Sequence, residues 1–126
     1  MMSFVIWLLQ IVLAATFVPS GISKLLLTPT QLVDRGLGYA EDYSYRSLKT
    51  IGVLEVLGGA ALVLPTLFGV LPTLVPLAAT GLAALMVGAG ITHHRRGEHR
   101  VIAVNAVLFT LALIVAVTRF GPYSLG

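Results

Sequence analysis

Three ionisable side chains interrupt long apolar stretches of this sequence, and they are the residues best suited to chemistry. Lys24 lies in "FVPSGISKLL", Glu55 in "IGVLEVLGGAALVLP", and His93 near the end of "GLAALMVGAGITHHRRGE". If these stretches cross a membrane, inserting one charge costs about 2.5–3.5 kcal/mol, so such residues are functional candidates. An amine, a carboxyl and an imidazole can exchange protons with a ligand or stabilise its charge. We therefore consider Glu55, Lys24 and His93 as candidate catalytic residues.

The helix face around Glu55 is built from small residues. Gly52 precedes the carboxylate by three positions and Gly59 follows it by four, so both share its face of a helix. A small face lets a second helix or a flat ligand approach closely, which makes both glycines ligand-binding candidates. A structural alternative stays open, in which Glu55 pairs with Lys24 or Asn105 and locks the helices together. Lys24 can also extend its long side chain toward the lipid headgroups.

Polar residues gather in one half of the expected membrane segments. With a rise of about 1.5 Å per residue, Ser20 and Glu55 lie about 10 Å from the membrane surface and Asn105 about 6 Å from it. Thr92 and the histidine after it lie at the surface itself. The other half offers little beyond Gln10. These depths predict one pocket that opens toward a single side, with Ser20, Thr92 and Asn105 as further ligand-binding candidates.

Composition identifies the elements that must hold these residues. The chain has 126 residues, of which 57% are hydrophobic and 10% are charged, whereas soluble domains carry about 25% charged residues. A spanning helix needs about 20 apolar residues, and four runs qualify: 4–27, 48–67, 71–92 and 101–118. The sequence therefore predicts one all-α domain over residues 1–126, an integral membrane antiparallel four-helix bundle. The connection 28–47 is long enough to hold a short interfacial helix that starts at Pro29.

The basic residues predict the orientation. Seven of the eight Lys and Arg residues flank the first and third connections, and the eighth, Arg119, lies at the other end. By the positive-inside rule, these two connections face the cytoplasm and both termini face outward. The first seven residues contain no Lys or Arg, so we expect the first apolar run to be a retained span rather than a cleaved signal peptide.

Several function classes are excluded or disfavoured. The chain has no cysteine, so thiol and disulfide chemistry are excluded. Adjacent His93 and His94 diverge by about 100° on a helix and cannot share one metal ion, so we expect no metal site. All three histidines lie in one short stretch, whereas haem b needs axial ligands on opposite sides, so we expect no haem. The net charge of +3 on so apolar a chain gives no reason to expect nucleic-acid binding.

The three stretches quoted above, in this order, resemble the DoxX/DoxX-like family of small four-span bacterial membrane proteins. The likeness covers nearly the whole chain. It implies that Lys24, Glu55, Gly58 and His93 occupy recurrent intramembrane positions of the family. The family is named after a subunit of a thiosulfate:quinone oxidoreductase, and other members are linked to oxidative-stress complexes. The resemblance thus implies a multi-pass protein of the bacterial inner membrane, with a quinone as the possible cofactor and a soluble or membrane protein as the redox partner.

Three functions are consistent with these observations. The first is a membrane subunit of an oxidoreductase that binds a quinone-like or other lipophilic small molecule. The second is a stand-alone acid–base enzyme, such as an isomerase or cyclase of an isoprenoid-type substrate, that uses Glu55. The third is a non-catalytic scaffold in the lipid bilayer. Gly81, Ala84 and Gly88 have the spacing of a close helix contact, within the bundle or in a homodimer.

Overall fold

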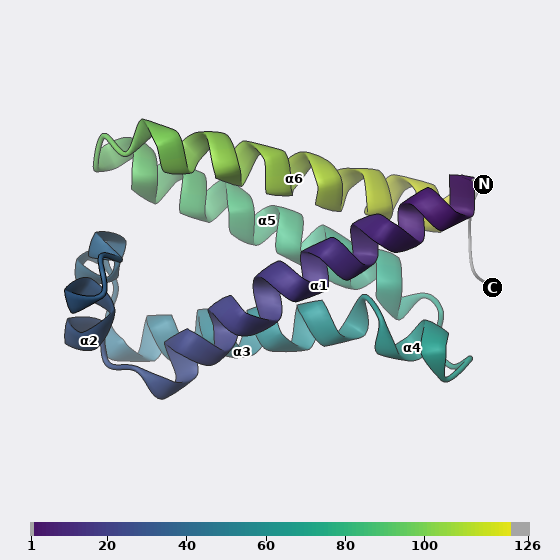
Figure 1. Cartoon of the computed structure of the whole chain (residues 1–126), viewed down its shortest axis with the longest axis horizontal. Helices are drawn as coiled ribbons and strands as arrows, with labels where there is room; N and C mark the ends of the chain where they lie inside the picture. The colour runs from purple at the N-terminus through teal and green to yellow at the C-terminus, as the bar shows by residue number, and fades with distance from the viewer. Residues whose placement is uncertain (1, 122–126) are drawn as a thin grey trace.

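The computed structural model describes residues 2–121, and every regular element in that range is helical. The four long helices are α1 (Met2–Leu26), α3 (Tyr45–Ala61), α5 (Leu74–Arg95) and α6 (His99–Phe120) (Figure 1). The connections contain α2 (Pro29–Asp34), the 3-10 helix η1 (Gly38–Asp42) and α4 (Leu64–Leu67). With α4 added to α3, four segments are long and apolar enough to cross a membrane. The predicted class, an all-α membrane protein with four spans, is confirmed.

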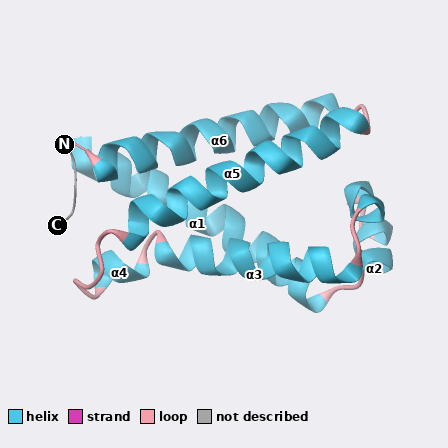
Figure 2. Cartoon of the chain, turned by 180° about the vertical axis from the view of Figure 1, so that it is seen from behind, coloured by secondary structure: helices cyan, strands magenta, loops and turns pink. Residues whose placement is uncertain are grey.

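The long helices form two pairs. α1 packs along α3 and α5 packs along α6, and these contacts are more extensive than those between the pairs. The pairs approach each other at the end where the chain starts and separate toward the end that carries α2 (Figures 1 and 2). We call the α2 end, with the turn between α5 and α6, the basic end, and the opposite end the terminal end. The separation leaves room between the pairs at the basic end.

Glycines bring α1 and α3 close together. A Cβ atom added to Gly21 would lie 2.6 Å from the carbonyl oxygen of Gly52, and one added to Gly59 would lie 2.7 Å from Cγ2 of Val18. Such distances are too short for a real side chain, so each glycine allows the neighbouring helix to approach. The sequence left open whether a helix or a flat ligand covers this small face. In the structure, helix α1 covers it.

The second predicted span is not one continuous helix. α3 ends at Ala61, and α4 begins at Leu64, next to Pro65. A proline has no N–H to donate and disfavours the helical conformation of the residue before it. At this break, the side-chain amide of Gln10 donates a hydrogen bond of 2.6 Å to the carbonyl oxygen of Leu62. The carbonyl thereby gains a partner from within the protein, which a membrane interior requires.

A short helix lies in the first connection and starts at Pro29, as the sequence predicted. A capping box between Thr28 and Gln31 fixes the first turn of α2. Gly36, with φ of 90°, takes a left-handed conformation just after the helix, where glycine is favoured. A small separate core holds α2 and η1 on α3, formed by Leu32, Ala40 and Leu48.

The main hydrophobic core lies toward the terminal end. Its buried residues come mostly from α1, α5 and α6 and include Leu13, Phe17, Val75, Ala79 and Val115. This packing fixes the helices where the two pairs meet. It leaves the basic half of the bundle to the polar residues that the sequence singled out.

Candidate functional site

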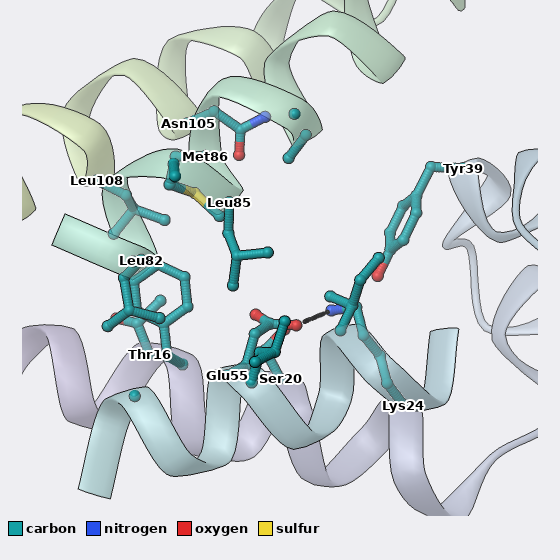
Figure 3. Close-up of a pocket in the computed structure, with 18 of the residues that line it drawn as sticks. Thr16, Ser20, Lys24, Tyr39, Glu55, Leu82, Leu85, Met86, Asn105 and Leu108 are labelled. Atoms are coloured by element: carbon teal, nitrogen blue, oxygen red, sulfur yellow. Dashed lines mark hydrogen bonds and ion pairs between the residues drawn. The ribbon is translucent and has the colours of Figure 1, made fainter. Parts of the chain in front are cut away.

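A cavity of about 1090 Å³ lies between the two helix pairs. It extends from the basic end, where Tyr39 and His93 line it, toward the main core, where Phe17 and Leu82 line it. Most of its walls are apolar, and a few polar side chains project into it (Figure 3). Apolar walls with a few placed polar groups are typical of sites for small molecules and cofactors. The cavity is therefore the candidate site.

One wall of the cavity carries a buried ion pair between α1 and α3. Nζ of Lys24 lies 2.7 Å from Oε1 of Glu55 and donates a hydrogen bond of 2.8 Å to Oγ of Ser20. The Lys24 and Glu55 side chains are only 9% and 4% exposed. Ser20 and Lys24 are four residues apart on one helix face, and this face points at Glu55, as the sequence predicted. Lys24 therefore turns into the bundle rather than toward its surface.

Asn105 projects into the cavity from the opposite wall, on α6 (Figure 3). The residue is 8% exposed, and its amide nitrogen Nδ2 is buried. Within residues 2–121, no group accepts a hydrogen bond from Nδ2. The hydrogen bond to Glu55 that the sequence left open is not formed between the described groups. Nδ2 of Asn105 is thus a buried donor without a partner among the described groups, on a side chain that lines the cavity.

Tyr39, in η1, is a cavity residue that the sequence analysis missed. The Lys24 amine lies 5.6 Å from the centre of the Tyr39 ring, and the same ring meets His93 edge to face, with centroids 5.3 Å apart. Tyr39 therefore stands between the ion pair and the histidine at the cavity mouth. No periodicity places a tyrosine in an irregular connection, so the sequence offered little signal for it.

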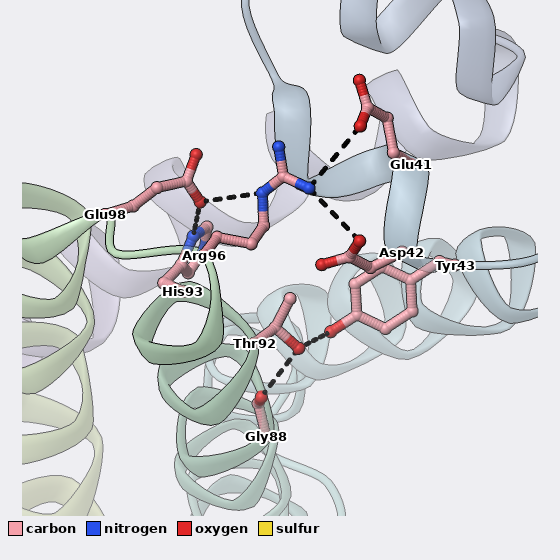
Figure 4. A network of polar contacts seen from close by, with 8 residues as sticks. All are labelled: Glu41, Asp42, Tyr43, Gly88, Thr92, His93, Arg96 and Glu98. Carbon is pink, nitrogen blue, oxygen red and sulfur yellow. Dashed lines mark hydrogen bonds and ion pairs between the residues drawn. The ribbon is translucent and has the colours of Figure 1, made fainter.

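Charged residues tie η1 to the turn between α5 and α6 at the mouth of the cavity (Figure 4). Nδ1 of His93 lies 2.8 Å from Oε1 of Glu98. Arg96 approaches Glu98 at 3.4 Å, Asp42 at 3.2 Å and Glu41 at 3.7 Å. The hydrogen bond with His93 holds the pKa of Glu98 below its usual value, and the charge of Arg96 acts in the same direction. His93 thus takes part in a network that holds η1 beside the cavity.

Comparison with known protein families agrees with the likeness noted in the sequence. The model of the DoxX-like family matches residues 8–115, most of the chain. The chain belongs to the DoxX-like family. No curated protein and no solved structure matches it. The matched range includes the whole cavity wall from Thr16 to Leu108.

Three ligand-binding candidates of this DoxX-like protein do not line the cavity. Gly52 and Gly59 are covered by α1, as described above. The hydroxyl of Thr92 lies 2.6 Å from the hydroxyl of Tyr43 and donates to the carbonyl of Gly88 at 3.3 Å. Thr92 therefore helps to hold the first connection against α5 (Figure 4). The cavity itself brings together Ser20, Lys24, Glu55, His93 and Asn105.

Lys49 also holds the end of a helix in place. The sequence analysis used this residue only to predict the orientation and did not reveal this role. Its Nζ donates hydrogen bonds to the carbonyl oxygens of Lys24, Leu25 and Leu27, at 2.9, 2.6 and 3.1 Å. These carbonyls end α1, where helices have no internal donors left and where positive charge is favourable. Lys49 therefore fixes the last turn of the helix that presents Lys24 to the cavity.

The terminal end of this family member holds a second buried polar cluster. Nε of Arg119 donates to Oε1 of Gln10 at 2.8 Å, and Nη1 donates to Oγ of Ser3 at 3.2 Å. Gln10 is fully buried and Arg119 is 3% exposed. The expectation that this half offers little beyond Gln10 was wrong, because Arg119 folds back into the bundle instead of facing solvent.

Proposed function

We propose that this protein binds a lipophilic molecule with an oxygen-bearing head group, a quinone or a close analogue, in the cavity between its helix pairs. The observation that carries this proposal is the buried Asn105 amide, which faces the cavity opposite the Lys24–Glu55 pair. A buried donor without an acceptor costs about 1–3 kcal/mol. A carbonyl oxygen of the ligand would supply that acceptor.

The size and the walls of the cavity support a ring-shaped head group. Its volume of about 1090 Å³ lies just above the range of about 300–1,000 Å³ that is common for small-molecule sites. Phe17, Leu82, Leu85 and Met86 give the part next to the main core an apolar surface. Burial against such side chains stabilises an apolar ring and its substituents.

Donors on facing walls fit a quinone, whose oxygen atoms lie at opposite edges of the ring. One oxygen would accept a hydrogen bond from Nδ2 of Asn105, and the other would accept one from Nζ of Lys24. Glu55 balances the charge of the ammonium group and holds it at the cavity wall. This ion pair favours a positioning role for Glu55 over the stand-alone acid–base role.

We propose that the protein binds the quinone as a membrane subunit of an oxidoreductase. The chain has no cysteine to carry electrons, so a partner protein would supply two electrons to reduce the quinone. The two protons of the quinol would come from water at the basic end, which the positive-inside rule predicts to face the cytoplasm. Exposed Arg35, Arg46, Arg95 and Arg100 give this end a surface suited to an acidic partner.

Asn105→Leu tests the binding site, because leucine has a similar size but no donor. We expect the purified variant to bind a decyl-substituted benzoquinone about five- to tenfold more weakly, as the loss of one hydrogen bond predicts. Titration calorimetry in detergent micelles measures this difference. Thr110→Val, on the exposed face of the same helix, is the matched control because it also removes a polar group.

The control is expected to bind the benzoquinone as the parent protein does. Equal affinity of the parent and Asn105→Leu would contradict the proposed role of the amide. A parent protein that binds no benzoquinone would refute quinone binding itself, and extraction of the lipids that copurify with the protein would then identify another occupant.

A further inference from the structure

One side of the cavity, between α3 and α5, is both apolar and open. Leu54 and Leu57 of α3 and Leu77 of α5 line the cavity, yet they are 47%, 61% and 53% exposed. Side chains that belong to a cavity wall and to the molecular surface at once mark an opening. Both helices lie in membrane-spanning segments, so this opening faces the hydrocarbon region of the bilayer.

Small residues of α5 keep this opening wide. Gly81, Ala84 and Gly88 line the cavity and share one helix face over about 10 Å. No atom of the described residues lies within 4 Å of a Cβ added to Gly81 or Gly88. The close helix contact that the sequence suggested for these residues is therefore not formed within residues 2–121. They leave a groove along α5 instead.

The opposite side of the cavity, between α1 and α6, carries polar side chains among apolar ones such as Phe17 and Leu108. Thr16, Ser20 and Ser23 of α1 and Asn105 of α6 line it. Hydroxyl and amide groups suit the oxygen atoms of a head group, whereas the leucines and glycines of the other side suit a hydrocarbon chain. The α1–α6 side of the cavity therefore suits a polar head group, and the α3–α5 side suits a hydrocarbon chain.

We propose that the opening between α3 and α5 is the passage through which the hydrocarbon chain of the bound ligand extends into the bilayer. In this arrangement the head group stays between Asn105 and Lys24, and Gly81 sets the width of the passage. This inference rests on the proposed function and adds the path of the chain. A second observation supports this role of the small residues: the Asn105 side chain projects into the same cavity, and its Nδ2 is buried without a partner among the described residues.

Gly81→Leu blocks the proposed passage without an obvious effect on packing. The added side chain meets free space at its Cβ, and leucine favours a helix more than glycine does. Gly90→Leu is the matched control, because Gly90 lies on the same helix, also has free space at its Cβ, and does not line the cavity. Two probes are compared: a decyl-substituted benzoquinone and the same benzoquinone without the chain.

We expect Gly81→Leu to bind the decyl-substituted benzoquinone about tenfold more weakly, because its side chain and the ligand chain compete for one space. The chainless benzoquinone should bind to Gly81→Leu as it does to the parent, and Gly90→Leu should bind both probes normally. Unchanged binding of the decyl probe to Gly81→Leu, or an equal loss for both probes, would overturn the proposed passage while leaving quinone binding intact.

A photoreactive group at the end of the decyl chain locates the chain directly. We expect it to label residues 54–61 of α3 and 74–84 of α5 in the parent protein, as mapped by mass spectrometry. Labelling of the α1–α6 side, around Thr16 and Leu108, would overturn the passage. Failure of the parent to bind either benzoquinone would instead refute the proposed function, and the passage with it.

Discussion

Gln10 and Asn105 are two buried amide side chains at opposite ends of this bundle, and they use their hydrogen-bonding groups differently. Gln10 is fully buried, donates to the carbonyl of Leu62 and accepts from Arg119. Asn105 is nearly as buried, but its Nδ2 finds no acceptor among residues 2–121. Gln10 lies beside the main core, whereas Asn105 lines the cavity.

The difference separates a structural polar group from one available for binding. A buried polar network whose members are hydrogen-bonded to one another makes a core rigid and specific. Through Gln10, the network at the terminal end joins α1 to α6 and to the break after α3. An unpaired buried donor instead lowers stability, by about 1–3 kcal/mol. Burial alone therefore does not reveal function in this protein, and the pairing of each polar atom is the informative observation.

The largest effect should come from removing the amides one at a time. Gln10→Leu leaves the Leu62 carbonyl without its donor and Arg119 without one acceptor, which should lower the free energy of unfolding by about 3 kcal/mol. Asn105→Leu removes a donor that has no acceptor here, so its stability should equal or slightly exceed that of the parent. Unfolding by SDS titration in mixed micelles measures both. Equal destabilisation by the two variants would contradict the distinction between the paired Gln10 amide and the unpaired Asn105 amide.

Two glycines extend the comparison from polar groups to packing. Gly21→Ala places a Cβ 2.6 Å from the Gly52 carbonyl oxygen, so it should destabilise the protein by about 1–3 kcal/mol. Gly81→Ala meets free space in the cavity and should stabilise α5 by up to about 1 kcal/mol. The same SDS titration checks both signs. Destabilisation by Gly81→Ala would show that α5 packs against another element at this position.

The sequence predicted what depends on local spacing. Apolar runs located the four membrane segments, and the four-residue interval between Ser20 and Lys24 placed both on the face that points at Glu55. Pro29 marked the start of α2. Each of these features depends on residues near one another along the chain, so helical periodicity was sufficient to find them.

The features that the sequence did not predict depend on which helices become neighbours. A small face around Glu55 suits a helix or a ligand equally, and only the fold shows that α1 covers Gly52 and Gly59. Arg119 lies close to the end of an apolar run, so the sequence alone suggests a surface charge. Only the fold shows that Arg119 lies beside Gln10. Tyr39 is brought to the cavity by a connection with no regular pattern. These positions follow from tertiary contacts that no local spacing encodes.

The smallest effect concerns pH and should separate the two ends of the molecule. The hydrogen bond with His93 lowers the pKa of Glu98 from its usual value of about 4.3. A group whose pKa is lower in the folded state stabilises the fold above its usual pKa, and this contribution is lost as the pH falls through the lowered pKa. Acid should therefore loosen the contact between η1 and the turn after α5. Since Glu98 is partly exposed to solvent, the shift in melting temperature should be only about 1–2 °C.

The chain's own aromatic residues can report where the acid acts. Trp7, the only tryptophan, lies on α1 at the terminal end, while Tyr39, Tyr43 and Tyr45 lie at the basic end. Gln10 and Ser3, the partners described for Arg119, carry no carboxyl, so mild acid should change tyrosine absorbance before it changes Trp7 fluorescence. Glu98→Gln, which cannot ionise, should show a weaker tyrosine change over the same pH range. A simultaneous change at Trp7 and the tyrosines would mean that the bundle responds to acid as one unit, and that the contact of Glu98 with His93 does not act locally.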